Sequence, residues 1–147
     1  MRNSFIIIKE VTSADTVYMY DLFEYPIDEA LAQRLVRSFR ARMKKRDSLV
    51  LGIFSVTEDR LAGVIEAYDL QDDGSLSIGY RVCPSMRKKG YGSAAVQLFC
   101  EWLLAHGVNL ITASAKTTNT ASCRILAKSG FAKIREERGH IIFNKYQ

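Results

Sequence analysis

The stretch Arg87-Lys88-Lys89-Gly90-Tyr91-Gly92-Ser93 separates two apolar segments of different periodicity, and this change decides the fold. Before it, apolar and polar side chains alternate up to Pro84, which is the pattern of a strand with one buried face. After it, apolar side chains recur at helical spacing from Ala94 until Gly107, which can end a helix. The segment therefore predicts a strand, a basic glycine-rich turn and a helix, in that order.

A turn of this composition predicts a binding site for phosphate or pyrophosphate. The first backbone N–H groups of a helix have no partner within the helix, and the helix dipole favours negative charge there. Gly90 and Gly92 have no Cβ, so the backbone can turn tightly and an anion can approach the amides. Arg87, Lys88 and Lys89 add positive charge. The spacing fits neither a P-loop nor a dinucleotide-binding fingerprint.

Length and composition predict one globular domain over residues 1–147. The chain has 48% hydrophobic and 25% charged residues, which is ordinary for a domain with a buried core. Three cysteines without paired spacing, and an N-terminus without a long apolar run, lead us to expect a reduced, cytoplasmic protein with no membrane segment. The two histidines and the cysteines show no metal-ligand spacing, so no metal is expected.

The net charge of +5 comes from one segment, residues 34–46, which holds seven bases and no acid. This segment could bind nucleic acid through its phosphates, or an acidic peptide, or the phosphates of a coenzyme. At helical spacing its residues form two stripes, one with Arg34, Arg37, Ala41 and Lys44 and the other with Leu31, Leu35, Ser38 and Arg42. Because no nucleic-acid motif accompanies the charges, the pattern favours an amphipathic helix with a solvated face over a nucleic-acid site.

The whole chain predicts an α/β (α+β) fold with a mostly antiparallel sheet. Helices are expected at 28–45, after the basic turn and at 119–129, while the aromatic-rich segment 11–26 is a helix or an ordered loop. About seven strands are expected, at 5–9, 49–56, 61–70, 76–82, 109–115, 131–136 and 140–146.

Two motifs together resemble those of the GNAT acetyltransferase superfamily. The basic turn reads R-x-x-G-x-G, which is similar to the acyl-coenzyme A signature [QR]-x-x-G-x-[GA]. Further on, Asn119 and Ser122 fit N-x-x-[AS], and Gly130-Phe131 follows at the interval typical of the family. The serine and the run Ile78-Gly79-Tyr80 look most like the subgroup that includes ribosomal-protein N-terminal acetyltransferases. The resemblance covers most of the chain from about Leu49 onward and is weak before it.

This resemblance implies a sheet of about seven strands, splayed at the cofactor site and flanked by about four helices. It implies acetyl-coenzyme A as cosubstrate, with its pyrophosphate on the turn. Backbone groups near Val82 and Cys83 would then pair with the pantetheine arm and direct an N–H at the thioester carbonyl. Asn119 would contact the pantetheine from the far side, or would act only as a helix N-cap. The pyrophosphate residues implied are Arg87, Lys88, Lys89, Gly90, Tyr91, Gly92 and Ser93.

The resemblance also implies a proton donor for the leaving thiolate and a base for the amine. The family's usual tyrosine position is Leu126 here, so Ser122 is the candidate acid. The usual glutamate position is Ser77, so Glu66 is the candidate base, although the pattern favours a Glu66 that only faces solvent. Tyr80, Asp69 or a water chain are further options for the base. Covalent catalysis by Cys83 is disfavoured because no histidine is close in sequence.

The expected function is N-acetyl transfer from acetyl-coenzyme A by direct attack of a primary amine in a ternary complex. The acceptor could be a protein N-terminus, a lysine, a polyamine or another small amine, and the protein could be a homodimer. The alternative is a GNAT-like module that binds coenzyme A without turnover, as a sensor or scaffold. The missing tyrosine and glutamate favour this alternative, whereas the intact turn and the Asn119–Ser122 pair favour the enzyme.

Overall fold

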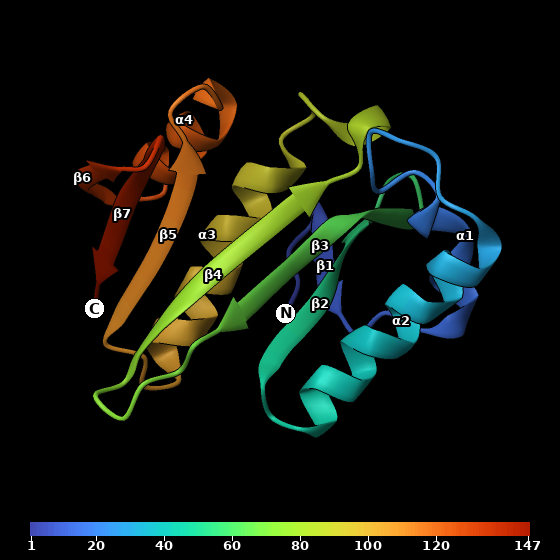
Figure 1. Ribbon diagram of the computed structural model, residues 1–147, viewed down its shortest axis with the longest axis horizontal. Helices are drawn as coiled ribbons and strands as arrows, with labels where there is room; N and C mark the ends of the chain where they lie inside the picture. Colours follow the sequence, from blue (N-terminus) through green and yellow to red (C-terminus); the bar gives the residue numbers. More distant parts are fainter.

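Seven strands form one mixed sheet in the computed structural model, which describes residues 1–147 (Figure 1). The strand order is β1-β2-β3-β4-β5-β7-β6, and every neighbouring pair is antiparallel except β4 with β5. The strands are β1 (Ile6–Lys9), β2 (Ser48–Ser55), β3 (Arg60–Tyr68), β4 (Ser75–Val82), β5 (Leu110–Lys116), β6 (Ala132–Glu137) and β7 (His140–Tyr146). The predicted seven-stranded, mostly antiparallel sheet is therefore confirmed.

Four α-helices cover the two faces of this sheet (Figure 1). They are α1 (Thr16–Met19), α2 (Glu29–Lys44), α3 (Tyr91–Ala105) and α4 (Thr120–Lys128), and two short 3-10 turns are η1 (Ser13–Asp15) and η2 (Pro84–Met86). The predicted helices correspond to α2, α3 and α4. The segment 11–26, which the sequence left open, consists of η1, the single turn of α1 and a loop that leads to α2.

Helix α3 packs on the face of the sheet opposite to α2 and forms the centre of the core. Phe99, Val96 and Ala95 on its inner side are fully buried among the strands. Its first residue, Tyr91, is also buried, and its ring stacks on Phe5 with centroids 4.7 Å apart. The turn before the helix is therefore fixed to the core through Tyr91.

Helix α2 is amphipathic as predicted, but its buried stripe is not the one expected. The structure buries Ala32, Val36 and Phe39, one residue beyond the Leu31–Leu35–Ser38 stripe. The reason is that small and aromatic side chains at these three positions fit against the sheet, while Leu31 and Leu35 are only half-buried and Ser38 is exposed. Arg42, on the expected stripe, is thereby directed along the sheet face rather than into the core.

None of the helices combines the length and the apolar character that a bilayer-spanning helix requires. No group of three or more histidine, cysteine, aspartate or glutamate side chains is arranged to hold a metal ion.

Candidate active site

The site lies where the two parallel strands separate. β4 and β5 pair only through Ser75–Ser77 with Leu110–Thr112, and beyond these residues they diverge (Figure 1). The end of β4 is still paired on its other side, because the Cys83 N–H donates to the Ala62 oxygen at 2.8 Å. Since backbone groups alternate in direction along a strand, the N–H and C=O of Val82 face the gap. The splay leaves one edge of β4 open to a ligand that carries amides.

This geometry corrects one expectation about the backbone donors. The sequence placed both Val82 and Cys83 at the reacting end of the cofactor, but the Cys83 N–H is already bonded within the sheet. Val82 is the one that faces the gap, and its carbonyl oxygen accepts a hydrogen bond from Arg87 Nε at 3.3 Å. Neighbouring residues of a strand point their N–H groups in opposite directions. The alternation of apolar side chains does not show which of these N–H groups are bonded to the partner strand.

The basic turn presents a row of free amides at the gap. The N–H groups of residues 88 to 93 have no hydrogen-bond partner within the protein, and no side chain caps the start of α3. Gly90 has φ of 89°, a left-handed conformation that favours glycine. At Gly92 a Cβ would lie 3.3 Å from both Val82 and Ile125, so a side chain would crowd the gap. The turn therefore leaves its backbone amides free at the start of α3.

Two of the three basic side chains of the turn are paired with acidic side chains, so fewer are free to bind an anion than the sequence suggested. Arg87 forms an ion pair with Glu24 at 2.7 Å, and Lys89 lies 3.6 Å from Glu58. The Arg87 hydrogen bond also holds the pKa of Glu24 below its usual value. Of the three bases only Lys88 has no acidic partner, because the loop between α1 and α2 and the β2–β3 turn place carboxylates beside the other two. Neither partner was expected from the sequence.

The loop that precedes α2 packs against the end of β4. Asp21 accepts hydrogen bonds from Arg60, at 3.1 Å, and from the Ser85 hydroxyl. The Arg81 guanidinium lies 5.1 Å from the centre of the Phe23 ring. These contacts join the divergent N-terminal part of the chain to the turn, so the aromatic loop residues lie beside the site instead of only covering the core.

Asn119 and Ser122 stand on the far side of the gap. Asn119 begins α4, and its Oδ1 accepts the Ser122 N–H at 3.1 Å, so its role as an N-cap is confirmed. The Ser122 hydroxyl shares a hydrogen bond of 2.7 Å with the hydroxyl of Tyr80 on β4. This bond joins the two sides of the splay on the face that carries α3.

Sequence reasoning did not predict the hydrogen bond between Tyr80 and Ser122, and it gave Tyr80 only a minor place among the functional candidates. Tyr80 lies in an alternating apolar run, where an aromatic residue predicts core packing, and it was considered only among several options for the base. In the structure its ring is partly buried beside Gly92, and burial raises the pKa of its hydroxyl despite the opposing effect of the Ser122 hydrogen bond. The phenol therefore stays protonated near neutral pH, and either hydroxyl can donate in its hydrogen bond with Ser122.

Glu66 lies on the opposite face of the sheet from this pair. It is paired across the strands with Gly79, and the two residues lie on the same face of the sheet. Its Oε2 accepts a hydrogen bond from Arg42 of α2 at 2.6 Å. The structure therefore separates the two predicted catalytic residues: Ser122 belongs to the α3 and α4 side, and Glu66 belongs to the α2 side. Arg42 was not foreseen as its partner.

The Cys83 thiol lies at the end of β4 but is fully buried. Burial raises its pKa to about 11, so the thiol stays protonated near neutral pH. A protonated, buried thiol is a poor nucleophile, which agrees with the expectation against covalent transfer.

Comparisons with known proteins agree with this geometry. Residues 6–132 match the model of the acetyltransferase (GNAT) domain. A Bacillus subtilis (strain 168) protein named "Probable N-acetyltransferase YjcK" is 28% identical over 117 residues, which are 76% of this chain and 64% of that protein. The match thus spans less than two thirds of this relative.

Solved structures share the fold at low sequence identity. A Vibrio cholerae protein described as a candidate ribosomal-protein-serine acetyltransferase has a TM-score of 0.88 at 12% identity, with 99% of this chain and 96% of that one covered. The microcin C7 self-immunity acetyltransferase MccE, solved with acetyl-CoA and AMP, has a TM-score of 0.75 at 15% identity, with 99% and 94% covered.

Proposed function

Because the chain belongs to the acetyltransferase (GNAT) domain family, we propose that it transfers the acetyl group of acetyl-coenzyme A to a primary amine. The observation that carries this proposal is the meeting of two sets of free backbone N–H groups: that of Val82, where β4 has left β5, and those of residues 88 to 93. We further propose that residues 1–147 act as one acetyltransferase domain, since all seven strands share one sheet.

The turn and the β4 edge divide the binding of the cosubstrate between them. The amides of residues 88 to 93, with Lys88, bind the pyrophosphate at the N-terminus of the 15-residue helix α3, which is the positive end of the helix dipole. Arg87 joins them when it leaves Glu24. The C=O of Val82 accepts a hydrogen bond from an amide of the pantetheine arm, as in a neighbouring strand, which leaves the Val82 N–H free for the thioester, and Asn119 closes the gap from the α4 side. This division explains why the strands separate at this point.

The reaction needs a neutral amine, an oxyanion donor and a proton for the thiolate. The amine nitrogen attacks the thioester carbonyl, and the Val82 N–H stabilises the charge that develops on its oxygen. As the C–S bond breaks, Ser122 gives its proton to the thiolate sulfur and receives one from the Tyr80 hydroxyl through their 2.7 Å bond. A phenol ionises far more readily than a serine hydroxyl, so Tyr80 supplies the acidity and Ser122 the position.

Glu66 serves the acceptor on the opposite face. Its carboxylate, held by Arg42, accepts the proton that the amine loses, either directly or through a water molecule. The acceptor reaches the thioester from the α2 face, whereas the coenzyme lies on the α3 face. Amine and thioester therefore meet inside the splay by direct attack, without an acyl-enzyme intermediate. Protein N-termini, lysines and small amines all carry the required nucleophile.

Two measurements test the proposal together. Titration calorimetry measures coenzyme A binding, and release of free thiol from acetyl-coenzyme A is followed across a panel of peptide N-termini, lysine peptides, polyamines and small amines. Amine-dependent thiol release supports the enzyme. Binding without release across the whole panel favours the non-catalytic module, for which the buried Leu126 at the usual acid position is the supporting observation. Absence of binding would overturn both.

A matched pair of glycine substitutions tests the cradle. Gly90 and Gly107 flank α3 and have φ of 89° and 94°, so alanine strains the backbone similarly at both positions, by about 1 kcal/mol. We expect Gly90→Ala to weaken coenzyme A binding at least about tenfold, because one misplaced turn amide loses a charge-assisted hydrogen bond. Gly107→Ala should bind as the wild type does. Equal loss in both variants would show that strain, not the cradle, is responsible.

A further inference from the structure

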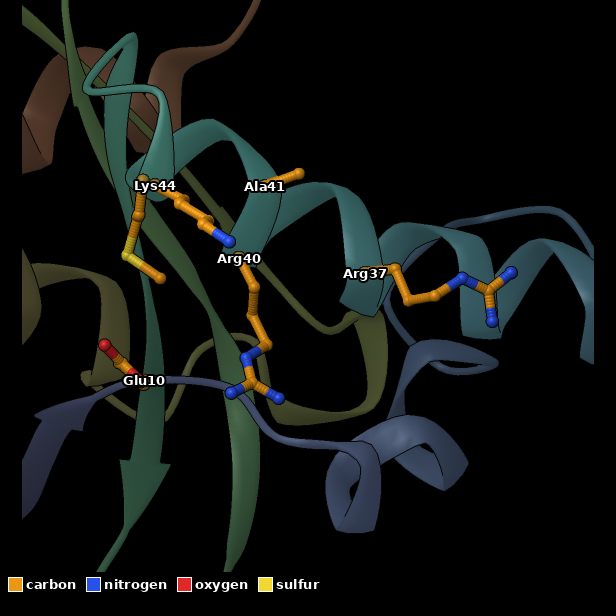
Figure 2. A pocket seen from close by; sticks show the side chains of 6 residues that line it. Glu10, Arg37, Arg40, Ala41 and Lys44 are labelled. Carbon is orange, nitrogen blue, oxygen red and sulfur yellow. The ribbon is translucent and has the colours of Figure 1, made fainter.

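The exposed side of α2 carries a basic groove that the acetyl-transfer site does not use. It has a volume of about 570 Å³ and is lined by Glu10, Arg37, Arg40, Ala41, Met43 and Lys44. Figure 2 shows Arg40 reaching from α2 toward the segment after β1, while Arg37 extends along the helix. The Glu10 carboxylate on that segment points away from the Arg40 guanidinium and forms no ion pair (Figure 2). Three bases against one acid give the groove a net positive charge.

The charge continues along the helix beyond the groove. All bases of residues 34–46 are exposed except Arg42, which is half-buried, and Arg42 is also the only one that has an acidic partner. Arg37, Arg40 and Lys44 follow one another at spacings of three and four residues, where like charges repel and destabilise a helix. A solvated face would normally mix both signs at such positions. The sequence alone favoured an ordinary solvated face here. The structure shows that this face is cationic, because its exposed bases have no acidic partners.

The surroundings of the groove favour a polyanion over a peptide. Peptides commonly add a strand to a free sheet edge, but the outer edge of β1 is already occupied by residues 1–3. The Ile8 N–H donates to the Met1 oxygen at 2.8 Å, and the Asn3 N–H donates to the Ile6 oxygen at 3.0 Å. Only Ala41 and Met43 offer apolar surface in the groove. Recognition there must rest on charge, and guanidinium forks match phosphate oxygens well.

We propose that this groove, with the exposed bases of α2 beside it, binds the phosphate backbone of a nucleic acid. The eleven residues from Arg34 to Lys44 extend about 15 Å along the helix axis, long enough for several consecutive phosphates. No exposed aromatic side chain lies within the groove for base stacking, so binding is independent of base sequence. The proposal does not depend on acetyl transfer.

The test uses the full chain and a fluorescein-labelled 20-nucleotide RNA of mixed sequence, with fluorescence anisotropy measured across a salt series. The triple variant Arg37→Gln, Arg40→Gln, Lys44→Gln removes three charges from the groove. The control variant Lys128→Gln, Lys133→Gln, Arg135→Gln removes three from α4 and β6, at the opposite edge of the sheet. All six side chains are exposed, so both variants should fold, which urea unfolding checks.

We expect the wild type and the control variant to bind RNA with steep salt dependence. The groove variant should lose at least about tenfold in affinity at low salt, and its log–log salt slope should fall by about 2. Saturating coenzyme A should leave RNA binding unchanged. The proposal is overturned by absence of salt-dependent binding, by equal losses in the two variants, by displacement of RNA with coenzyme A, or by a poly-glutamate peptide that competes as well as RNA does.

Discussion

The hydrogen bond between Tyr80 and Ser122 is the most consequential single contact of the proposed site. It joins β4 to the first turn of α4 across the splay, and it is the only hydrogen bond that either hydroxyl makes within the protein. The bond satisfies a largely buried phenol hydroxyl. The proton path that we propose runs through the same bond, so the two roles must be separated by experiment.

Tyr80→Phe tests this role. We expect kcat to fall about a hundredfold, because general acid catalysis typically contributes that much, with little change in coenzyme A affinity. Ser122→Ala should behave alike, and the double variant should lose little more, since both residues serve one proton path. Tyr68→Phe, which removes a half-buried hydroxyl from β3, is the control. Additive losses in the double variant would contradict the relay.

Two buried thiols give the fold a predictable pH dependence. Burial raises the pKa of Cys83 to about 11 and that of Cys100 to about 12, from an ordinary value of 9.0. Above pH 9 the unfolded chain releases these protons while the folded protein retains them. The folded state then binds more protons, so the free energy of unfolding falls as pH rises, by up to about 1.4 kcal/mol per pH unit for each thiol.

Cys83→Ala should therefore flatten the decline in stability between pH 9 and pH 11. Urea unfolding at several pH values measures this slope, and it is independent of any constant loss caused by the smaller side chain. The control is Cys123→Ala, which removes a partly exposed thiol from α4. If the slope of the Cys83 variant equals that of the wild type, the thiol is not protected as the structure indicates.

Among the elements, β4 shows how one strand can serve two partners. Its first half bridges β3 and β5, whereas its second half pairs with β3 alone. The strand pattern of residues 76–82 predicted the element and its buried face, because alternation depends only on local sequence. It could not predict where β5 departs, because that depends on how α3 and α4 fill the space between the two strands.

Hydrogen exchange can distinguish the two edges of β4. The Cys83 amide is bonded to Ala62, so it should exchange slowly with or without coenzyme A. The Val82 amide faces the gap, so it should exchange faster in the free protein and slow markedly when the coenzyme binds. Residue-resolved NMR exchange measures both amides in one sample, and Cys83 is the internal control. Equal protection of the two amides in the free protein would contradict the open edge.

The element α2 has a different function on each side. Its Arg42 side faces Glu66, its buried stripe packs on the sheet, and its outer side forms the basic groove. The sequence predicted the helix and its charge correctly. Its spacing grouped Leu31 with Leu35 on one stripe, whereas the structure buries Ala32, Val36 and Phe39, because the fit against the sheet decides the helix orientation.

At the scale of the whole molecule, α3 helps to hold together two parts of the sheet whose shared strand ladder, between β4 and β5, has only three residue pairs. It contacts strands β1 to β4 on one side and α4 on the other. Phe99 is its largest fully buried side chain. Loss of packing here should affect the entire fold and not one half of it.

Phe99→Ala should lower the free energy of unfolding by about 3–5 kcal/mol, as expected for a large cavity in a close-packed core. Urea unfolding followed by both fluorescence and circular dichroism should show a single transition shifted to lower urea. Leu70→Ala is the control, because Leu70 is 72% exposed and its truncation should change stability little. Two separated transitions in the Phe99 variant would mean that the sheet halves unfold independently.

The sequence by itself determined the elements, their order, the basic glycine turn and the asparagine–serine motif, and it thereby indicated the family. These features are local: periodicity, capping and glycine conformation depend on neighbours within a few residues. Only the tertiary structure decided which partners meet across the chain. It joined Tyr80 to Ser122, Arg42 to Glu66 and Arg87 to Glu24, and it turned the Cys83 amide away from the gap. Such contacts depend on strand register and helix orientation, which the packing of the whole core sets.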